Sequence, residues 1–94
     1  MEYPLVSIIT VTRNRGDLLR RCINSVLTQT YTNIEHIVVD GASDDNTDDV
    51  VAEFKDERLR FVKLESNWPI KETLDYGVSL SQGKYLSFLD SDDE

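Results

Sequence analysis

The chain has 94 residues, of which 30% are charged and 39% are hydrophobic, a balance typical of one small folded domain rather than a disordered chain. Eighteen acidic residues against ten basic residues give a net charge of −8, which argues against nucleic acid or a strongly anionic membrane surface as the main partner and favours a cation. No apolar run approaches the ~20 residues that span a bilayer, and the N-terminus lacks the features of a signal peptide, so we expect a cytoplasmic protein.

Strands and helices are predicted in alternation along the chain. Strand prediction rests on short apolar segments rich in β-branched and aromatic residues, and helix prediction rests on apolar side chains that recur every three or four residues. Cys22, the single cysteine, lies in the apolar stripe of the first helix, so we expect a buried thiol and no intrachain disulfide. In chain order the predicted elements are a strand at 5–11, a helix at 17–29, a strand at 35–39, a helix after the polar cluster 43–47, a strand at 59–64, a helix between 69 and 83, and a strand at 85–89.

This alternation predicts a Rossmann-like α/β fold, in which parallel strands are joined by right-handed crossovers and helices cover both faces of the sheet. The usual strand order is 3-2-1-4, and ligands bind at the carboxyl ends of the strands where the chain direction reverses. Polar clusters follow three of the four predicted strands, at residues 12–15, 40–43 and 90–93. We therefore expect these clusters to meet at one rim of the sheet.

The last of these clusters is acidic. Asp90, Asp92, Asp93 and Glu94 follow an apolar strand directly. Two carboxylates about 4 Å apart repel each other by roughly 4 kcal/mol at an effective dielectric near 20, so a folded chain that gathers them usually holds a cation. A solvated acidic tail is the alternative interpretation.

The loop after the first strand has neither a GxGxxG fingerprint nor a GxxxxGK[ST] phosphate loop, which argues against dinucleotide binding and P-loop chemistry. Phosphates bound here would be neutralised by a metal on the acidic cluster, helped by Arg13, Arg15 or Lys71, although a solvated surface role is the alternative for each base. His36 is expected to be a packed strand residue, and Trp68 is expected to cover the edge of the core.

Four segments in order resemble the successive signatures of family 2 glycosyltransferases, and together they span nearly the whole chain. They are residues 6–15 (VSIITVTRNR), 25–31 (SVLTQTY), 35–47 (EHIVVDGASDDNT) and 83–93 (GKYLSFLDSDD). The resemblance implies a GT-A fold that binds a nucleotide-diphosphate sugar, most often a UDP-sugar. It also implies transfer of the sugar, with inversion at the anomeric carbon, to a saccharide or lipid-linked acceptor.

The resemblance also implies roles for individual residues. Asp90, Asp92 and Asp93 match the DXD motif that holds Mn2+ or Mg2+ on the donor diphosphate, with Asp92 also near the nucleotide. Asp40 matches the acid that reads the uracil ring. Thr10, Val11, Thr12, Asn14 and Ser43 are expected to line the nucleotide pocket, and Arg13 and Lys71 are the candidates for phosphate contacts.

The sequence departs from the family pattern in three places. Gly41 follows Asp40 where many members have a second acid, and Pro69 and Asp75 stand where glycine and asparagine are common.

In length, residues 1–94 match only the nucleotide-sugar-binding portion of a transferase domain. The acceptor contacts and the general base are expected beyond Glu94, so we expect no catalytic residue and no turnover in these residues alone. The fourth strand would then be a bare sheet edge, which favours self-association.

Other functions remain open at this point. A non-catalytic module that binds a nucleotide or a cation could derive from the same half-fold. A nucleotidyltransferase shares that half-fold, but the segments 29–31 and 40–43 favour sugar transfer. A phosphoacceptor signalling domain would need a lone aspartate after its third strand, where this chain has Glu65-Ser66-Asn67. In a parent transferase, the inner face of the membrane is also a candidate location.

Overall fold

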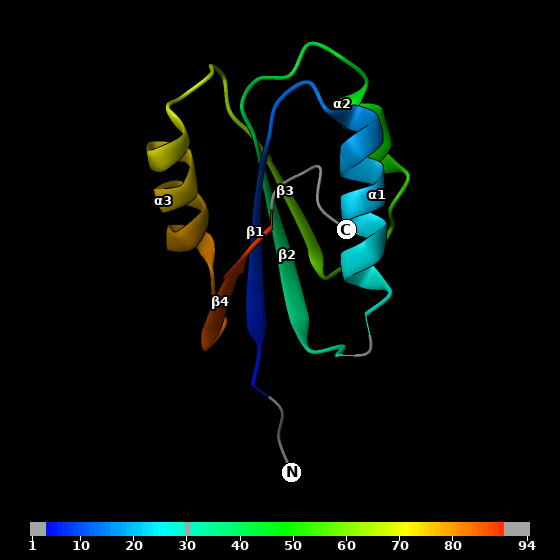
Figure 1. Ribbon diagram of the computed structural model, residues 1–94, viewed down its shortest axis with the longest axis vertical. Helices are drawn as coiled ribbons and strands as arrows, with labels where there is room; N and C mark the ends of the chain where they lie inside the picture. Colours follow the sequence, from blue (N-terminus) through cyan, green and yellow to red (C-terminus); the bar gives the residue numbers. More distant parts are fainter. Residues whose placement is uncertain (1–3, 30, 90–94) are drawn as a thin grey trace.

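The computed structural model describes residues 4–29 and 31–89, and it contains the predicted parallel sheet. The strand order is β3-β2-β1-β4, as expected from the alternation of elements. Figure 1 shows the two inner strands running side by side through the centre of the molecule. The strands are β1 (Val6–Thr12), β2 (Ile34–Asp40), β3 (Leu59–Lys63) and β4 (Tyr85–Phe88).

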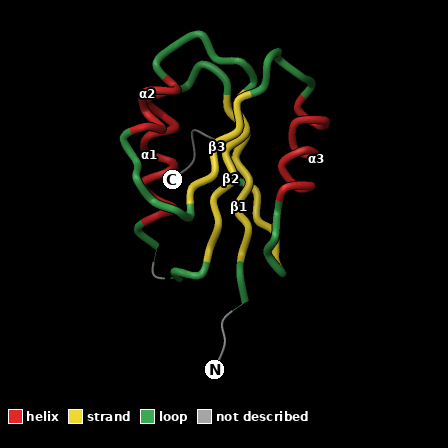
Figure 2. The backbone as a smooth tube through the Cα atoms, turned by 180° about the vertical axis from the view of Figure 1, so that it is seen from behind, coloured by secondary structure: helices red, strands yellow, loops and turns green. Residues whose placement is uncertain are grey.

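Helices cover both faces of the sheet, which confirms the doubly wound arrangement. Two helices, α1 (Gly16–Leu27) and α2 (Thr47–Ala52), pack together on one face, whereas α3 (Ile70–Leu80) lies on the opposite face. The view from behind in Figure 2 shows the same three layers. No helix in residues 4–29 and 31–89 has the length and apolar character needed to cross a bilayer.

The apolar core has a layer on each side of the sheet. Leu19 and Ile23 of α1 pack against Val38 of β2, and all three side chains are fully buried. On the other side α3 approaches the sheet closely at Gly77, where an added Cβ would lie 2.8 Å from Cγ2 of Ile9. That distance is shorter than real Cβ contacts, so the helix can lie this close only because the residue is glycine.

A polar group of three residues is buried beneath α1. Nε2 of His36 lies 2.8 Å from Oγ1 of Thr10, and Sγ of Cys22 lies 3.8 Å from the same hydroxyl. All three residues are fully buried, as expected for Cys22 and His36. Burial lowers the pKa of His36 to about 4, so the imidazole is neutral at physiological pH.

A buried carboxylate, that of Glu35, joins the amino-terminal ends of the strands to the segment between α3 and β4. Oε2 of Glu35 accepts hydrogen bonds from Oγ of Ser7 and from the backbone N–H of Gln82, both at 2.6 Å. Oε1 accepts a longer bond, 3.3 Å, from Arg60. Burial alone would raise the pKa of Glu35, but these hydrogen bonds outweigh it and lower the pKa. The carboxylate therefore holds three separate segments together in its charged form.

The edge strand β4 is exposed along its whole length. Tyr85, Leu86 and Phe88 are 55%, 45% and 56% exposed, although each is a large apolar side chain. In the described part of the chain β4 pairs only with β1, so its outer backbone edge is free. Self-association through this edge remains a prediction.

Candidate functional site

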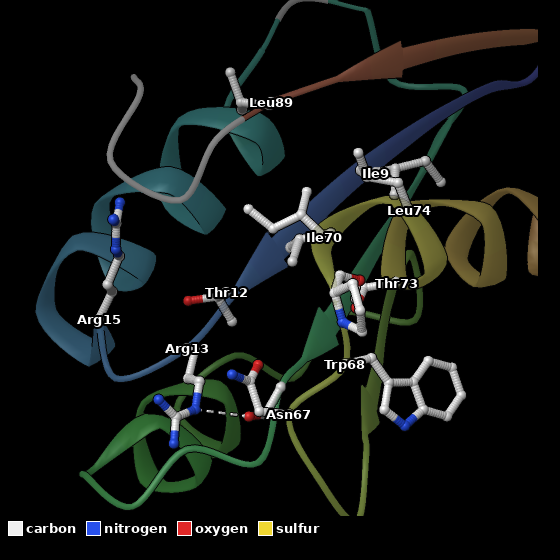
Figure 3. Close-up of a pocket in the computed structure, with 13 residues that line it drawn as sticks. Ile9, Thr12, Arg13, Arg15, Asn67, Trp68, Ile70, Thr73, Leu74 and Leu89 are labelled. Atoms are coloured by element: carbon white, nitrogen blue, oxygen red, sulfur yellow. Dashed lines mark hydrogen bonds between the residues drawn. The ribbon is translucent and has the colours of Figure 1, made fainter.

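A cavity of about 650 Å³ opens at the carboxyl ends of the strands, the place where doubly wound sheets bind ligands. Its volume lies in the range of small-molecule sites. Figure 3 shows Thr12, Arg13 and Arg15, from the end of β1 and the loop after it, on one side of the cavity. The segment that leads into α3, residues 67–70, forms the other side.

Thr12 brings an unpartnered hydroxyl group to this cavity. The residue is only 2% exposed and lines the cavity, yet its Oγ1 has no hydrogen-bond partner among the described residues. Buried polar groups in folded proteins are nearly always hydrogen-bonded, because burying one without a partner costs about 1–3 kcal/mol. The Thr12 hydroxyl is therefore a group that a bound ligand or a water molecule would satisfy.

Gly41 lines the cavity next to the side chains of Arg13 and Asn67. Nε of Arg13 donates to the carbonyl oxygen of Gly41 at 3.0 Å, the contact that Figure 3 marks with a dashed line. A Cβ at position 41 would lie 2.9 Å from Oδ1 of Asn67. The absence of a second acid after Asp40 thus makes room for the Asn67 carboxamide. Sequence reasoning did not select Asn67, although the unexpected glycine was the signal for a close approach here.

Three residues predicted to bind nucleotide, Asp40, Ser43 and Asn14, form hydrogen bonds that hold two loops together. The carboxylate of Asp40, fully buried at the end of β2, accepts hydrogen bonds from the backbone N–H and the hydroxyl of Ser43. The Ser43 hydroxyl accepts a hydrogen bond from the backbone N–H of Asn14 at 2.8 Å. In turn, Oδ1 of Asn14 accepts a hydrogen bond from the backbone N–H of Asp44 at 2.7 Å. The Asn14 φ of 55° gives the loop after β1 the turn that these bonds need. A direct ligand role for Asp40, Ser43 and Asn14 stays a prediction.

Asp45 completes the connection between these loops. Its Oδ2 accepts a hydrogen bond from the N–H of Gly16, the first residue of α1, at 3.1 Å. Its Oδ1 accepts one from the N–H of Thr47, the first residue of α2, at 3.0 Å. The hydrogen bond from the Thr47 side chain and these two backbone bonds lower the pKa of Asp45. One carboxylate therefore occupies the N-terminal ends of two helices.

The remaining residues considered in the sequence analysis differ in whether they line the cavity. The Thr10 side chain is buried with His36 and does not line the cavity, whereas the partly buried Val11 does. Lys71 lines a smaller neighbouring hollow and forms an ion pair with Asp75 at 3.3 Å, and it is not among the residues that line the larger cavity. Trp68 lines the wall of the cavity and packs edge-on against Tyr76, with 5.6 Å between the ring centroids.

The predicted metal ligands Asp90, Asp92 and Asp93 lie outside the described residues. Leu89, the last described residue, lines the cavity, and its N–H donates to the carbonyl oxygen of Ile9 at 3.0 Å. The described chain therefore ends at the rim of the cavity with Leu89. Carboxylate oxygens are the donors that Mn2+ and Mg2+ prefer, and the role of the three aspartates as metal ligands stays a prediction. Within residues 4–29 and 31–89 no three His, Cys, Asp or Glu side chains lie together as a metal site.

Comparison with known proteins gives a consistent assignment. The family described as Glycosyl transferase family 2 matches residues 7–94. The glycosyltransferase GlyG of Streptococcus pneumoniae is 35% identical over 95% of this chain and 30% of its own length. An Escherichia coli protein, the UDP-Glc:alpha-D-GlcNAc-diphosphoundecaprenol beta-1,3-glucosyltransferase WfaP, is 37% identical over 95% of this chain and 36% of its own. The chain spans about a third of the length of these curated relatives.

Solved structures of transferases share the fold. The mannosyltransferase PcManGT of Pyrobaculum calidifontis, solved with GDP-Man and Mn2+, aligns with a TM-score of 0.88 at 25% identity and covers 97% of this chain and 28% of its own. TarS of S. aureus, solved with UDP, aligns with a TM-score of 0.84 at 28% identity and covers 93% of this chain and 27% of its own. The fold is therefore that of the GT-A glycosyltransferases.

Proposed function

The chain belongs to glycosyl transferase family 2, and we propose that it is the donor-binding half of a metal-dependent enzyme that transfers a sugar from a UDP-sugar with inversion. The observation that carries this proposal is the cavity of about 650 Å³ at the carboxyl ends of the strands, lined by an unpartnered buried hydroxyl and by arginine side chains. It has the size and polarity that a nucleotide-diphosphate sugar requires. The transferase complexes with UDP and with GDP-Man support a nucleotide ligand.

The residues of this chain would bind and orient the donor. Arg13 is held in place by its bond to Gly41, so its two terminal nitrogens are pre-positioned to meet negative charge on the donor. The interloop bonds of Asp40, Ser43 and Asn14 would keep the walls of the cavity rigid before the donor binds. This pre-organisation would lower the entropy cost of binding the donor.

Asp90, Asp92 and Asp93 would hold Mn2+ or Mg2+ at the rim where Leu89 leaves the sheet. When bound, the ion supplies positive charge that neutralises the departing nucleoside diphosphate. Asp40 is not included among the proposed metal ligands, and its carboxylate oxygens accept hydrogen bonds from Ser43.

The acceptor, a saccharide or a lipid-linked saccharide, would bind outside residues 1–94, where the general base is also expected. WfaP supports a lipid-linked acceptor, because its name specifies a diphosphoundecaprenol substrate. We expect the 94 residues to bind the donor without turnover. Sugar transfer by these residues alone would contradict this part of the proposal.

The test is calorimetric titration of the chain with UDP and with GDP, each with and without Mn2+. We expect UDP to bind in a Mn2+-dependent manner, and we expect Asp92→Asn and Asp93→Asn to weaken binding. Asp49→Asn is the matched control, because it removes one exposed carboxylate from α2 at a distance from the cavity lining. If neither nucleotide binds under any condition, the chain is not a donor half-site. If the control variant weakens binding equally, net charge rather than the DXD motif is responsible.

A further inference from the structure

We propose that Asp45 is a positioning residue for donor binding, because its carboxylate holds the loop after β1 in the conformation that forms one side of the cavity. Asp45 is not among the residues that line the cavity, so it acts through that loop and not by contact with the donor. The inference rests on the proposed function, since it takes the loop to belong to the donor site. Two features carry it: the bonds of Asp45 to two helices, and the shortness of the loop.

Asp45 supplies a side-chain acceptor to the starts of both α1 and α2. Helices are normally capped by a side-chain oxygen of the residue directly before the first turn. Among the described residues, neither Arg15 before α1 nor Asn46 before α2 makes such a bond. Oδ2 of Asp45 accepts from the N–H of Gly16, and Oδ1 accepts from the N–H and the hydroxyl of Thr47. The bond to Thr47 is local, whereas the bond to Gly16 joins residues 29 positions apart.

The starts of the two helices lie close together. A Cβ added at Gly16 would overlap with Oδ1 of Asn46, a contact that glycine avoids. Figure 1 shows the loops after β1 and β2 at the end of the molecule where α1 and α2 begin. Farther along the helices, Arg20 of α1 pairs with Glu53 of α2 at 2.7 Å. The helices are therefore joined at two levels, and Asp45 makes the connection next to the loops.

The loop between β1 and α1 is short and is fixed at both ends. It contains three residues, between Thr12 at the end of β1 and Gly16 at the start of α1. Parallel pairing with β2 fixes the Thr12 end, and the bond to Asp45 fixes the Gly16 end. Arg13 and Arg15, which lie within the loop, line the cavity. A shift of Gly16 would therefore move both arginines, because three residues leave little chain to absorb it.

Loosening this loop would lower donor affinity without removing any group from the cavity. A long side chain that is not held in place must be ordered when the ligand binds, which costs about two- to tenfold in affinity. Two arginines lie in the loop, so we expect a loss of about tenfold when Asp45 no longer holds it. The bonds of Arg13 to Gly41 and of Asn14 to Ser43 would remain and limit the loss.

The test is calorimetric titration with UDP in the presence of Mn2+, for wild type, Asp45→Ala and Asp45→Asn. Alanine removes both side-chain oxygens and should weaken UDP binding about tenfold. Asparagine keeps one acceptor oxygen, so it can serve one helix and should weaken binding by a smaller factor. Asp49→Asn is the matched control, since it removes the same charge from the first turn of α2 and should bind UDP as wild type does.

Two further measurements distinguish positioning from a general loss of stability. Glu35→Ala removes a carboxylate that bonds to Ser7 at the opposite end of the sheet, and it should bind UDP as wild type does although it destabilises the fold. Hydrogen exchange followed by NMR should accelerate at the amides of Gly16 and Thr47 in Asp45→Ala, by more than at the amides of β2. Far-UV circular dichroism verifies that each variant is folded.

The outcomes separate the positioning role from the donor site. If wild type binds UDP and both Asp45 variants bind it with wild-type affinity, the positioning role is wrong and the proposed function stands. The role is also wrong if Glu35→Ala or Asp49→Asn weakens binding as much as Asp45→Ala, because lost stability or lost charge would then be the cause. If wild type binds no nucleotide, with or without Mn2+, the proposed function is wrong and the positioning role is wrong with it.

Discussion

Acidification is expected to destabilise this fold through His36. The imidazole is fully buried beneath α1, where Nε2 meets Thr10 and Nδ1 has no partner among the described residues. Its pKa is about 4 in the folded chain against an ordinary value of 6.5. The unfolded chain therefore takes up a proton near pH 6.5, whereas the folded chain does so only near pH 4. Stability is complete above pH 6.5 and is lost as the pH falls toward 4.

The size of this effect follows from the two pKa values. Each pKa unit corresponds to about 1.4 kcal/mol, so the total loss is about 3 kcal/mol, of which about 2 kcal/mol is lost by pH 5. A small domain has only about 5–15 kcal/mol of stability, so this loss is large. Partial opening of the helix above the ring would make the observed loss smaller.

The assay is urea unfolding at pH 7.5 and pH 5.0, followed by far-UV circular dichroism, for wild type and His36→Gln. Glutamine stays neutral over this range, so the variant reports the titration of all other groups. We expect wild type to lose about 2 kcal/mol more than the variant between the two pH values. Equal losses in the two proteins would refute the assignment of acid sensitivity to His36.

Two substitutions test the packing of the fold by the same unfolding assay at pH 7.5. Glu35→Ala should lower the free energy of unfolding by about 2–3 kcal/mol, because it removes the acceptor shared by three segments. Glu57→Ala, at an exposed position, is the control and should change the free energy of unfolding by less than about 0.5 kcal/mol. Similar values for the two variants would contradict a structural role for Glu35. Gly77→Ala should destabilise by about 1–3 kcal/mol through its clash with Ile9, even though alanine favours a helix. A more stable Gly77→Ala variant would mean that α3 does not lie as close to the sheet as described.

The architecture could be predicted from the sequence because its signals are local and repeated. Apolar periodicity located every strand and helix to within a few residues, and strict alternation of the two predicted parallel pairing. The strand order followed from the usual topology of such folds. The Glu35 interactions could not be predicted in this way, because they join residues 28 and 47 positions apart that no periodic pattern connects.

The site was predicted less completely than the fold. Sequence reasoning placed the candidate site at the rim where polar clusters follow the strands, and a cavity lies at that rim. It could not predict the hydrogen bonds between the two loops, in which Asn14 and Ser43 bond to each other and to neighbouring residues, and the ligand role expected of both residues stays a prediction. Lys71 was selected for its charge, and the sequence pattern did not indicate its ion pair with Asp75 one helical turn away. Asn67 was missed because its carboxamide lies where a side chain at position 41 would be, and no local sequence pattern connects positions 41 and 67.

The bonds from Asp45, Asn14 and Ser43 have a consequence for engineering and for divergence within the family. The loops after β1 and β2 contact each other through backbone donors and side-chain acceptors, and each loop supplies both donors and acceptors to the other. A loop exchanged alone from a relative would leave unpaired groups on its neighbour, whereas the two loops exchanged together would carry their own partners. The two loops therefore form one structural unit, and we expect a paired exchange to preserve stability where an exchange of one loop alone lowers it.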